Sequence, residues 1–401
     1  MLSEYEAIDT LLSHAKLLVD NETVSINNAS TRICAKNIIA PINVPAQDNS
    51  AMDGFACNSN DVAINSHIEI SQRIATGSNP PALKPGTTAR IFTGASIPAG
   101  ADCIVIQENC AYDDSSVSFR TTPILGQHIR YAGEDIKQGQ IILHRGDVIG
   151  PAQIGLIASL GIDTVCVYKK LRIALLTTGS ELLEPGSKNE DGKRYNSNRY
   201  TLTAAINQLG FDVSHHQIIA DNLNDTQNEL IARSADADVV ISTGGVSVGD
   251  EDHVKNALEN TGTMHLWKIA MKPGKPLAFG SVNNTPFIGL PGNPVSALIT
   301  YLIIARPFLL SCQGVTLRPL IRYPVKSGFD WQTQKRCEYL RVTLQQEGDE
   351  LIAHRYQSQD SGIQNSLHNS DGLARIEIES QIQTGDIISF SPYSSLLSPS
   401  I

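Results

Sequence analysis

Residues 239–252 read VVISTGGVSVGDED, an apolar run that ends in two glycines, small hydroxyl residues and a cluster of acids. Val239, Val240 and Ile241 suit a buried strand. Residues 243–249 suit neither a strand nor a helix, because glycine weakens both. A strand followed by a glycine-rich loop and a helix can bring backbone N–H groups close to an anion. A lone Gly-Gly pair is more often an ordinary turn, so the stretch alone leaves both interpretations open.

Strands and helices alternate around this stretch, from residue 171 to residue 312. The expected strands are RIALLTTG (172–179), VSHHQIIAD (213–221), DVVISTG (238–244), MHLWKIA (264–270) and TPFIGL (285–290). The expected helices are NRYTLTAAINQLG (198–210), LNDTQNELIARSA (223–235), DEDHVKNALEN (250–260) and PVSALITYLIIARPFLL (294–310). Regular alternation of this kind predicts a doubly wound α/β domain with a parallel sheet.

Ligands of an open parallel sheet gather beyond the carboxyl ends of its strands. The loops expected there carry acids and lysines: Glu181, Asp221, Asp250, Glu251, Asp252, Lys268, Lys272 and Lys275. Carboxylate oxygens are the ligands that Mg²⁺ prefers, and lysine meets phosphate as a point charge. Any one of these residues is more often a solvated loop charge. Five such loops at one edge favour a site for a phosphorylated ligand held with a divalent cation.

The rest of the chain is organised differently. Apolar residues at helical spacing between Tyr5 and Val19 predict one amphipathic helix near the start. Short β-rich runs separated by Gly/Pro turns predict a mostly β region from about Pro41 to Arg145, followed by a short helix in PAQIGLIASLG (151–161). After Cys312, the runs EYLRVTL, LIAHRYQ, LARIEI and DIISFS predict a small β domain.

Composition narrows the class of protein. A length of 401 residues predicts about two to four domains, and a formal charge of −10 argues against a nucleic-acid surface. Seven scattered cysteines without a C-x-x-C pair disfavour structural zinc and suggest a reducing compartment, although their spacing leaves a disulfide open. The acidic start lacks the features of a signal peptide. The longest apolar stretch, 297–310, is too short to span a bilayer. We expect a cytoplasmic protein that binds neither nucleic acid nor membrane.

Three further sequence features are weak evidence for a functional site when each is taken alone. GLPGNPVS (289–296) is a stiff turn that leads into a helix, which suits structure and function equally. NSAMDGFA (49–56) places Asp53 before Gly54, and Asp-Gly is ordinarily a turn. His215 and His216 are adjacent on a strand, so their side chains face opposite ways and suit structural roles better than a shared metal.

Six motifs in chain order resemble those of the molybdopterin molybdenumtransferase family. They are NSAMDGFA, RIFTGASIP, GEDI, STGGVSVGDED, WKIAMKPGKP and GLPGNPVSA. The same module resembles the C-terminal domain of gephyrin. The likeness runs from about Leu11 to about Phe390, which is nearly the whole chain.

The resemblance implies a multidomain α/β protein that forms an elongated homodimer. Four domains are expected: an elongated linker domain (1–45 with 136–166), an inserted mostly β domain (46–135), an α/β molybdopterin-binding domain (167–312) and a C-terminal small β-barrel (313–401). The family reaction takes adenylylated molybdopterin and molybdate, inserts molybdenum into the dithiolene and releases AMP, with Mg²⁺ or a similar cation. No cysteine is required to ligate molybdenum, because the pterin brings its own sulfurs.

The resemblance also assigns candidate site residues by motif match. The candidate catalytic residues are Asp53, Glu181, Asp221, Asp252, Lys268 and Lys272, of which Glu181, Asp221 and Asp252 would hold the metal. The candidate substrate-binding residues are Thr93, Asp135, Gly244, Gly245, Ser247, Lys275, Pro291, Pro294, Arg341 and Ser361. In TTGSEL (177–182), many relatives carry Asp in place of Ser180, which leaves any separate role of that Asp in doubt.

Two other functions stay open. A molybdopterin adenylyltransferase, which acts one step earlier, would resemble the α/β domain alone, and the additional β regions argue against it. That enzyme is instead expected as a partner. A non-catalytic scaffold like gephyrin would not need Asp53, Asp252, Lys268 and Lys272 in combination. Turnover of adenylylated molybdopterin would argue against the adenylyltransferase. Binding of a peptide partner without turnover would indicate the scaffold.

Overall fold

The structure is a computed structural model that describes residues 1–246 and 253–399. Two units pack separately. The first contains residues 1–36, 145–150 and 164–401, and the second contains residues 37–144 and 151–163. Residues 1–36 therefore pack with the α/β region, and the predicted linker domain is shared between the two units. The division into four domains stays a prediction.

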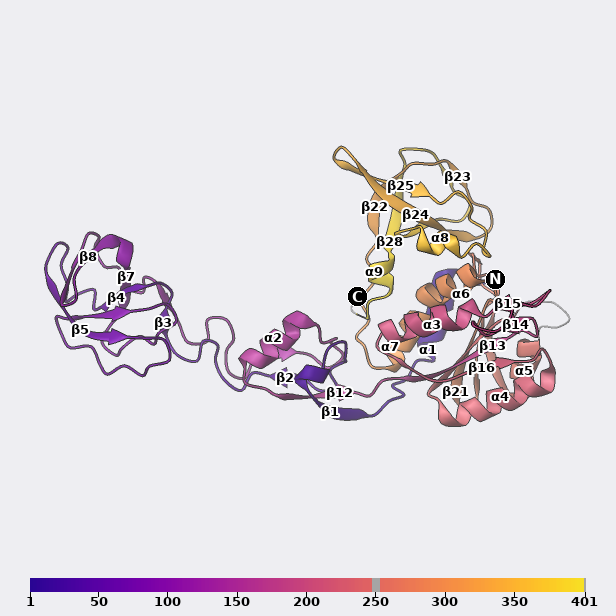
Figure 1. The fold of residues 1–401 in the computed structure, drawn as a ribbon, viewed down its shortest axis with the longest axis horizontal. Helices are drawn as coiled ribbons and strands as arrows, with labels where there is room; N and C mark the ends of the chain where they lie inside the picture. Colours follow the sequence, from indigo (N-terminus) through magenta and orange to yellow (C-terminus); the bar gives the residue numbers. More distant parts are fainter. Residues whose placement is uncertain (247–252, 400–401) are drawn as a thin grey trace. The chain divides into compact units, whose positions relative to one another are not determined.

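A mixed sheet forms the centre of the first unit, in the strand order β16-β13-β17-β21-β20-β18 (Figure 1). Strands β16, β13, β17 and β21 run parallel, as predicted. Strand β20 runs antiparallel to both of its neighbours, so the expected all-parallel sheet is wrong at this edge. The bounds are β13 (Arg172–Thr178), β16 (Asp212–Ile219), β17 (Val239–Thr243), β18 (Gly262–Trp267), β20 (Ala278–Val282) and β21 (Thr285–Leu290).

The antiparallel edge has a local cause. Asn283 and Asn284 join β20 to β21, and both have positive φ, at 51° and 69°. Two consecutive residues in this conformation form the tight turn that suits the twist of a β-hairpin. The sequence AFGSV of β20 contains a central glycine and little β-branched character, which is why the sequence pattern missed it.

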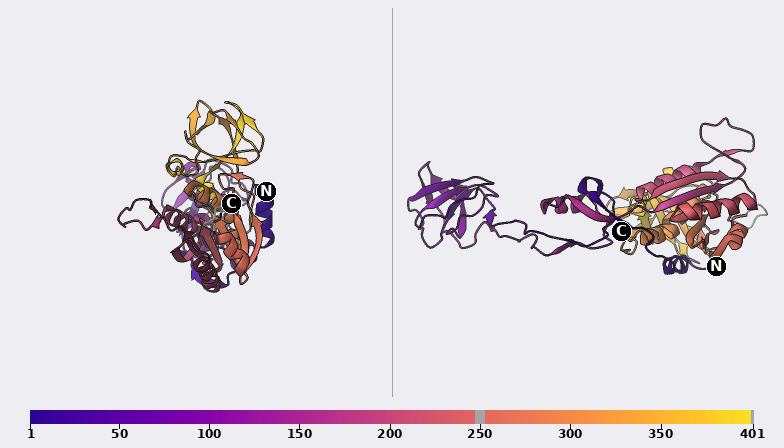
Figure 2. Two further views of the ribbon diagram at one scale, coloured as in Figure 1. Left: turned by 90° about the vertical axis from the view of Figure 1, so that its right-hand side faces the viewer. Right: turned by 90° about the horizontal axis from the view of Figure 1, so that it is seen from below.

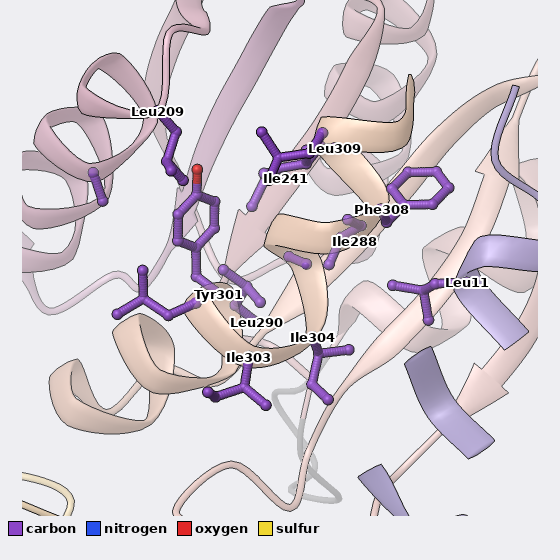
Figure 3. Close-up of a cluster of buried hydrophobic side chains, with 14 of the residues drawn as sticks. Leu11, Leu209, Ile241, Ile288, Leu290, Tyr301, Ile303, Ile304, Phe308 and Leu309 are labelled. Carbon is purple, nitrogen blue, oxygen red and sulfur yellow. The ribbon is translucent and has the colours of Figure 1, made fainter. Parts of the chain in front are cut away.

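Helices cover both faces of the sheet, because side chains alternate along each strand. Ile173 and Leu175 of β13 enter one apolar core, whereas Ala174 and Leu176 enter the other. The first core is closed by helices α1 (Glu4–Ser13), α3 (Ser197–Gln208), α6 (Pro294–Thr300) and α7 (Arg306–Cys312), and the second by α4 (Leu223–Asp236) and α5 (His253–Thr261). Figure 3 shows Phe308 and Leu309 beside Ile241 and Ile288 in the first core.

Residues 294–312 form one continuous helix with a change of pitch. A π-helical segment, η3 (Tyr301–Ala305), joins α6 to α7. Pro307 cannot donate an N–H to the preceding turn, and it lies just after the π-helical segment, where the regular α-helical hydrogen-bond pattern is already interrupted. The helix is long and apolar enough to cross a membrane by length and composition, but 83% of its apolar window is buried inside the protein. Its apolar surface is therefore already covered by the α/β core.

The C-terminal region forms the predicted small barrel, seen as a ring of yellow strands in the left view of Figure 2. Five strands close on themselves through a pairing between β24 and β26. A short strand of the α/β region, β19 (Met271–Lys272), adds in parallel to β24. The barrel strands are β22 (Tyr323–Ser327), β24 (Cys337–Glu347), β25 (Glu350–Arg355), β26 (Gly372–Ile376) and β28 (Ile387–Pro392).

The remaining elements of the first unit are short. Strand β1 (Asn21–Ser25) pairs with β12 (Thr164–Tyr168), and β14 (Leu182–Leu183) pairs with β15 (Arg194–Tyr195). Strand β23 (Trp331–Gln332) pairs with β27 (Gln381–Ile382) beside the barrel. The other helical turns are η1 (Ile26–Asn28), α8 (Asn365–His368) and α9 (Tyr393–Leu396).

The second unit is mostly β, as the sequence predicted. Its main sheet has the order β7-β4-β6-β5-β9-β8, and small ribbons pair β2 with β11 and β3 with β10. Phe55 and Phe119 are fully buried in one of its cores. The bounds are β2 (Ile38–Ile39), β3 (Asn49–Ser50), β4 (Gly54–Cys57), β5 (Ile68–Ile74), β6 (Thr88–Ile91), β7 (Cys103–Ile106), η2 (Gln107–Asn109), β8 (Cys110–Tyr112), β9 (Ser116–Phe119), β10 (Ile129–Arg130), β11 (Ile141–Leu143) and α2 (Pro151–Ser159).

Candidate functional site

A cleft of about 760 Å³ lies at the carboxyl ends of the parallel strands of the first unit. Thr178 ends β13, Thr243 ends β17, and Pro291 follows β21, and all three line the cleft. This is the edge at which ligands bind in open α/β sheets. The position confirms that the loops after these strands meet, as the sequence predicted.

Gly244 and Gly245 line the cleft directly after β17. Both have positive φ, at 88° and 64°. A Cβ atom on Gly244 would lie 2.7 Å from the carbonyl oxygen of Thr178, and one on Gly245 would lie 2.7 Å from a methyl carbon of Val254. Only glycine fits this turn without strain, so the pair brings the main chain itself to the cleft wall.

Two of the predicted acids also line the cleft, Glu181 and Asp221. The Ser180 N–H donates to Asp221 Oδ2 at 2.7 Å, and the Asp221 N–H donates to Ser180 Oγ at 3.2 Å. The two loops therefore hold each other through a reciprocal pair of hydrogen bonds. The hydroxyl of Ser180 supplies an acceptor at this position without adding another charge beside Asp221.

The segment 194–198 also lines the cleft, although the sequence did not assign it to the site. Asn198 Nδ2 donates to the carbonyl of Gly292 at 2.7 Å, which ties this segment to the GLPGNPVS turn. Asn196 is buried, caps α3 and donates to Thr177 Oγ1 at 2.8 Å. Arg194 is exposed. Among the described residues that line the cleft, it is the only arginine. The segment contains several polar residues directly before the expected helix at 198–210. This pattern is the sequence signal that could have identified the segment as part of the site.

The predicted lysines lie elsewhere. Among the described residues, the cleft lining includes Pro276 but not Lys268, Lys272 or Lys275. Lys272 Nζ lies 3.1 Å from Glu338 Oε1 on the barrel. Lys268 has a positive φ of 70°, and its Nζ lies 6.0 Å from the ring centroid of Trp267. The structure therefore does not bring these side chains to the lining of the cleft, and residues 271–272 leave the sheet to pair with β24. The catalytic and substrate-binding roles of the three lysines stay predictions.

The GLPGNPVS turn connects the cleft to the barrel. Pro291 and Pro294 line the cleft, as does Gly362 of the barrel. Asn293 Nδ2 donates to Ser361 Oγ at 2.9 Å. Ser361 therefore lies next to the cleft wall through its contact with Asn293, and its predicted contact with substrate stays a prediction.

Arg341 does not line the cleft. Its side chain is fully buried, with 0% exposure. Arg341 Nε donates to Ser366 Oγ at 3.2 Å, and Nη2 donates to the carbonyl of Asp360 at 3.1 Å. The predicted direct contact of Arg341 with a substrate has no support in this arrangement.

Ser247 and Asp252, which were predicted to bind substrate and metal, lie outside the described residues. Within residues 1–246 and 253–399, no group of three or more His, Cys, Asp and Glu side chains is arranged to hold a metal ion. Glu181 and Asp221 are the two predicted metal ligands that the structure describes. Both reach the same cleft.

Asp53, Thr93 and Asp135 belong to the second unit. Asp53 Oδ1 accepts hydrogen bonds from the Thr93 N–H and from Thr93 Oγ1, both at 2.8 Å. These bonds from Thr93, with a smaller contribution from Arg90, hold the pKa of Asp53 below its ordinary value. Asp135 lies on a separate stretch, where its N–H donates to the carbonyl of Val44. The structure brings Asp53 and Thr93 together and leaves Asp135 apart from that pair's hydrogen bonds.

Comparison with known protein families identifies the class of three regions of the chain. Residues 174–311 match the model of a probable molybdopterin binding domain. Residues 2–161 match the MoeA N-terminal region, domains I and II, and residues 324–393 match the MoeA C-terminal region, domain IV. The α/β domain with its cleft is therefore of the molybdopterin-binding class, and it is flanked by the two regions characteristic of MoeA proteins.

Individual relatives agree over most of the chain. A molybdopterin molybdenumtransferase of Haemophilus influenzae is 39% identical over 78% of both chains, and a molybdopterin molybdenumtransferase 2 of Mycobacterium tuberculosis is 36% identical over 73% of this chain and 75% of its own. Two crystal structures of the molybdopterin biosynthesis MoeA protein of Pyrococcus horikoshii cover 98% of this chain, with TM-scores of 0.81 at 26% identity and 0.85 at 23% identity. The chain belongs to the molybdopterin molybdenumtransferase family.

Proposed function

We propose that this chain inserts molybdenum from molybdate into adenylylated molybdopterin and releases AMP. The observation that carries the proposal is the cleft itself. It combines the close approach of the main chain at Gly244 and Gly245 with two carboxylates, Glu181 and Asp221, in the domain that matches the molybdopterin-binding model. Backbone N–H groups suit phosphate oxygens, and carboxylates suit a cation that accompanies them.

Main-chain groups and one cationic side chain among the described residues would bind the phosphate groups of the substrate. The turn at Gly244–Gly245 and the neighbouring loop around Asn293 both bring main chain to the cleft, where phosphate oxygens of the substrate would lie. Arg194 supplies a positive charge on the same cleft. Cleaving a phosphoanhydride depends more on neutralising charge than on a strong nucleophile. Fixed donors that need no rearrangement are therefore the main contribution of the protein.

A divalent cation fits the two carboxylates. Asp221 Oδ2 accepts a hydrogen bond from the Ser180 N–H, and both Asp221 and Glu181 line the cleft. We propose that Glu181 and Asp221 hold Mg²⁺, together with Asp252. The cation would neutralise charge on the phosphate oxygens as AMP departs. The reciprocal bonds between Ser180 and Asp221 would keep the Asp221 carboxylate in place.

The assembly follows from the same proposal. We propose a cytoplasmic homodimer that receives adenylylated molybdopterin from the adenylyltransferase of the preceding step. The support is the family resemblance, which implies a homodimer.

The experiment is a product assay with purified protein, adenylylated molybdopterin, molybdate and Mg²⁺. Release of AMP together with formation of molybdenum cofactor supports the proposal. Adenylylated product from ATP and free molybdopterin would instead identify the earlier enzyme, and binding of a peptide partner without turnover would identify a scaffold. The variant Asp221→Asn should lose at least about tenfold in kcat with little change in thermal stability, because loop charges contribute little to folding.

A further inference from the structure

Arg341 is a buried cation in strand β24 of the barrel that is bound to main-chain and hydroxyl oxygens. Its Nη2 donates to the carbonyl of Asp360 at 3.1 Å and to the carbonyl of Ser358 at 3.5 Å, and its Nε donates to Ser366 Oγ at 3.2 Å. The Arg341 N–H also donates to Gln359 Oε1 at 2.9 Å. One residue therefore holds the segment 358–360 from several directions.

The next residue in that segment reaches the cleft. The carbonyl of Ser361 accepts the N–H of Val295 at 3.1 Å, in the first turn of α6. Ser361 Oγ accepts from Asn293 Nδ2 at 2.9 Å. Asn293 and the neighbouring Gly362 both line the cleft. The hydrogen bonds of Arg341 to residues 358–360, the peptide bond to Ser361 and the hydrogen bonds of Ser361 thus connect the buried guanidinium to the cleft wall.

We propose that Arg341 is a positioning residue that holds the segment 358–361 against Asn293 and the beginning of α6. It fixes one wall of the cleft without touching the substrate. Removing the guanidinium would leave the partly buried carbonyl oxygens of Ser358 and Asp360 without this donor, which favours their exposure to water. The segment would then shift toward water, and Ser361 would move with it.

Arg306 offers a matched control within the same unit. It is also buried, at 2% exposure, and its Nη2 donates to the carbonyls of Ser398 and Ser395, at 2.6 Å and 3.4 Å. Its partners lie at the C-terminal segment and not at residues 358–361. Arg341→Met and Arg306→Met each remove a buried guanidinium that binds two carbonyls, but only the first should affect the cleft.

The first measurement is hydrogen exchange in the full-length protein. Arg341→Met should lower the protection of the Val295 amide and of residues 358–362, because the acceptor carbonyl of Ser361 is no longer held. Arg306→Met should leave that protection unchanged. Unchanged protection of Val295 in Arg341→Met would overturn the proposal. This measurement uses no substrate, so its result is independent of the proposed function.

The second measurement is a double-mutant cycle on kcat/KM for adenylylated molybdopterin, which rests on the proposed function. Arg341→Met should lower kcat/KM by about tenfold in the wild-type background, mainly through KM, but by less than about threefold in the Ser361→Ala background. Arg341→Lys, which keeps one cationic donor, should recover part of the loss. If Arg341 instead touched the anionic substrate, the two losses would multiply and Arg341→Met would weaken the salt dependence of KM.

The two measurements separate the possible failures. A wild-type protein that makes no molybdenum cofactor would refute the proposed function, while the exchange data would still decide whether Arg341 holds the segment. If Arg341→Met does not fold, Arg341→Lys takes its place in both measurements. In that variant, wild-type protection of Val295 combined with a tenfold loss in kcat/KM would contradict the positioning role, because activity would be lost without movement of the segment.

Discussion

Lys272 and Glu338 form an ion pair between the α/β domain and the barrel. Lys272 Nζ lies 3.1 Å and 3.2 Å from the two carboxylate oxygens of Glu338. The Glu338 side chain is 8% exposed and also accepts a hydrogen bond from Trp331 Nε1 at 3.1 Å. The two residues stand opposite each other because β19 pairs with β24. The barrel therefore determines where this lysine can reach.

Glu338→Gln should lower kcat/KM by about three- to tenfold while the melting temperature changes little. The amide keeps an acceptor for Trp331 but loses the charge that orients Lys272. Because the Lys272 side chain is 42% exposed, the ion pair contributes at most about 1 kcal/mol to stability. Steady-state kinetics and thermal unfolding measure the two effects.

Glu350→Gln is the matched control, since Glu350 pairs with Lys326 on the same barrel. It should leave kcat/KM at the wild-type value. An equal loss in both variants would show that the barrel responds to any missing charge and that the pair with Lys272 has no special part in positioning.

Arg194→Gln should weaken the binding of AMP by about five- to tenfold, because a phosphate loses one charge-assisted donor at the cleft. Binding of adenosine, which lacks the phosphate, should stay unchanged. Isothermal titration calorimetry measures both. Arg172→Gln is the control, since Arg172 begins β13 at the opposite end from the cleft and pairs with Asp238. A similar loss in both variants would attribute the effect to net charge alone.

Glu4→Ala should destabilise the first unit by about 3–5 kcal/mol, the range for removing one partner of a buried ion pair. The Glu4 side chain is 1% exposed, and its carboxylate accepts from Arg375 Nε at 2.6 Å and from Tyr339 Oη at 2.8 Å. It thereby ties α1 to the barrel. Chemical denaturation with urea measures the change.

Glu6→Ala provides the comparison on the same helix. Glu6 is exposed and completes the capping box with Ser3, so its loss should destabilise the protein much less than the loss of the buried Glu4. Equal effects of the two substitutions would mean that the contact between α1 and the barrel adds no stability beyond that of the helix itself.

The sequence predicted those parts of the site that depend on single strands and their loops. Gly244, Gly245, Glu181 and Asp221 follow buried parallel strands, so the strand pattern alone placed them at one edge. The position of Lys272 depends instead on a two-residue pairing with a strand more than sixty residues away, shown by the register of Lys272 with Glu338. No periodicity in the sequence reports such a pairing.

Two other features of the structure also differ from what the sequence predicted, the burial of Arg341 and the strand β20. The local sequence pattern predicts that an arginine in a β-rich run is exposed. Arg341 is buried because carbonyls some twenty residues later in the chain accept its hydrogen bonds, and a local pattern does not show those contacts. The antiparallel strand β20 was missed because its five residues carry a weak β signal. Local patterns predicted the elements, whereas contacts between distant segments decided which side chains reach the cleft.

Asp53 should titrate below the ordinary pKa of an aspartate, and Thr93→Val should raise its pKa. The Thr93 N–H and hydroxyl both stabilise the ionised carboxylate, and the substitution removes the hydroxyl. Because the pKa of Asp53 is lowered on folding, its contribution to stability is present above the unfolded value and is lost as the pH falls through the folded value. NMR titration of the side-chain carboxyl measures the shift.

Asp113 supplies an internal reference in the same unit. Hydrogen bonds from Ser115 and Ser116 lower its pKa to about 2, and Thr93→Val should leave that value unchanged. An unshifted Asp53 in Thr93→Val would assign the lowered pKa to the backbone N–H alone. A wild-type Asp53 that titrates at the ordinary value would contradict the hydrogen bonds themselves.

The last prediction is that one working site needs two chains. Asp53 lies in the second unit and Lys272 in the first. The family resemblance makes both of them candidate catalytic residues and implies a homodimer. A two-fold dimer would contain two equivalent working sites, each built from residues of both chains. Suppose that Asp53→Asn and Lys272→Ala are each inactive as homodimers. In a mixed dimer, one working site would then carry both substitutions and the other would carry neither.

Random mixing makes about half of the dimers mixed, so about a quarter of all clefts would be intact under this symmetry. Co-expression of the two variants, or unfolding and refolding them together, should therefore recover about a quarter of wild-type activity. Mass spectrometry would verify that mixed dimers form. If Asp53 and Lys272 served a cleft within one chain, every cleft would carry one substitution and the mixture would stay inactive. Inactivity of verified mixed dimers would thus refute the shared site, because only sites built from two chains can restore each other.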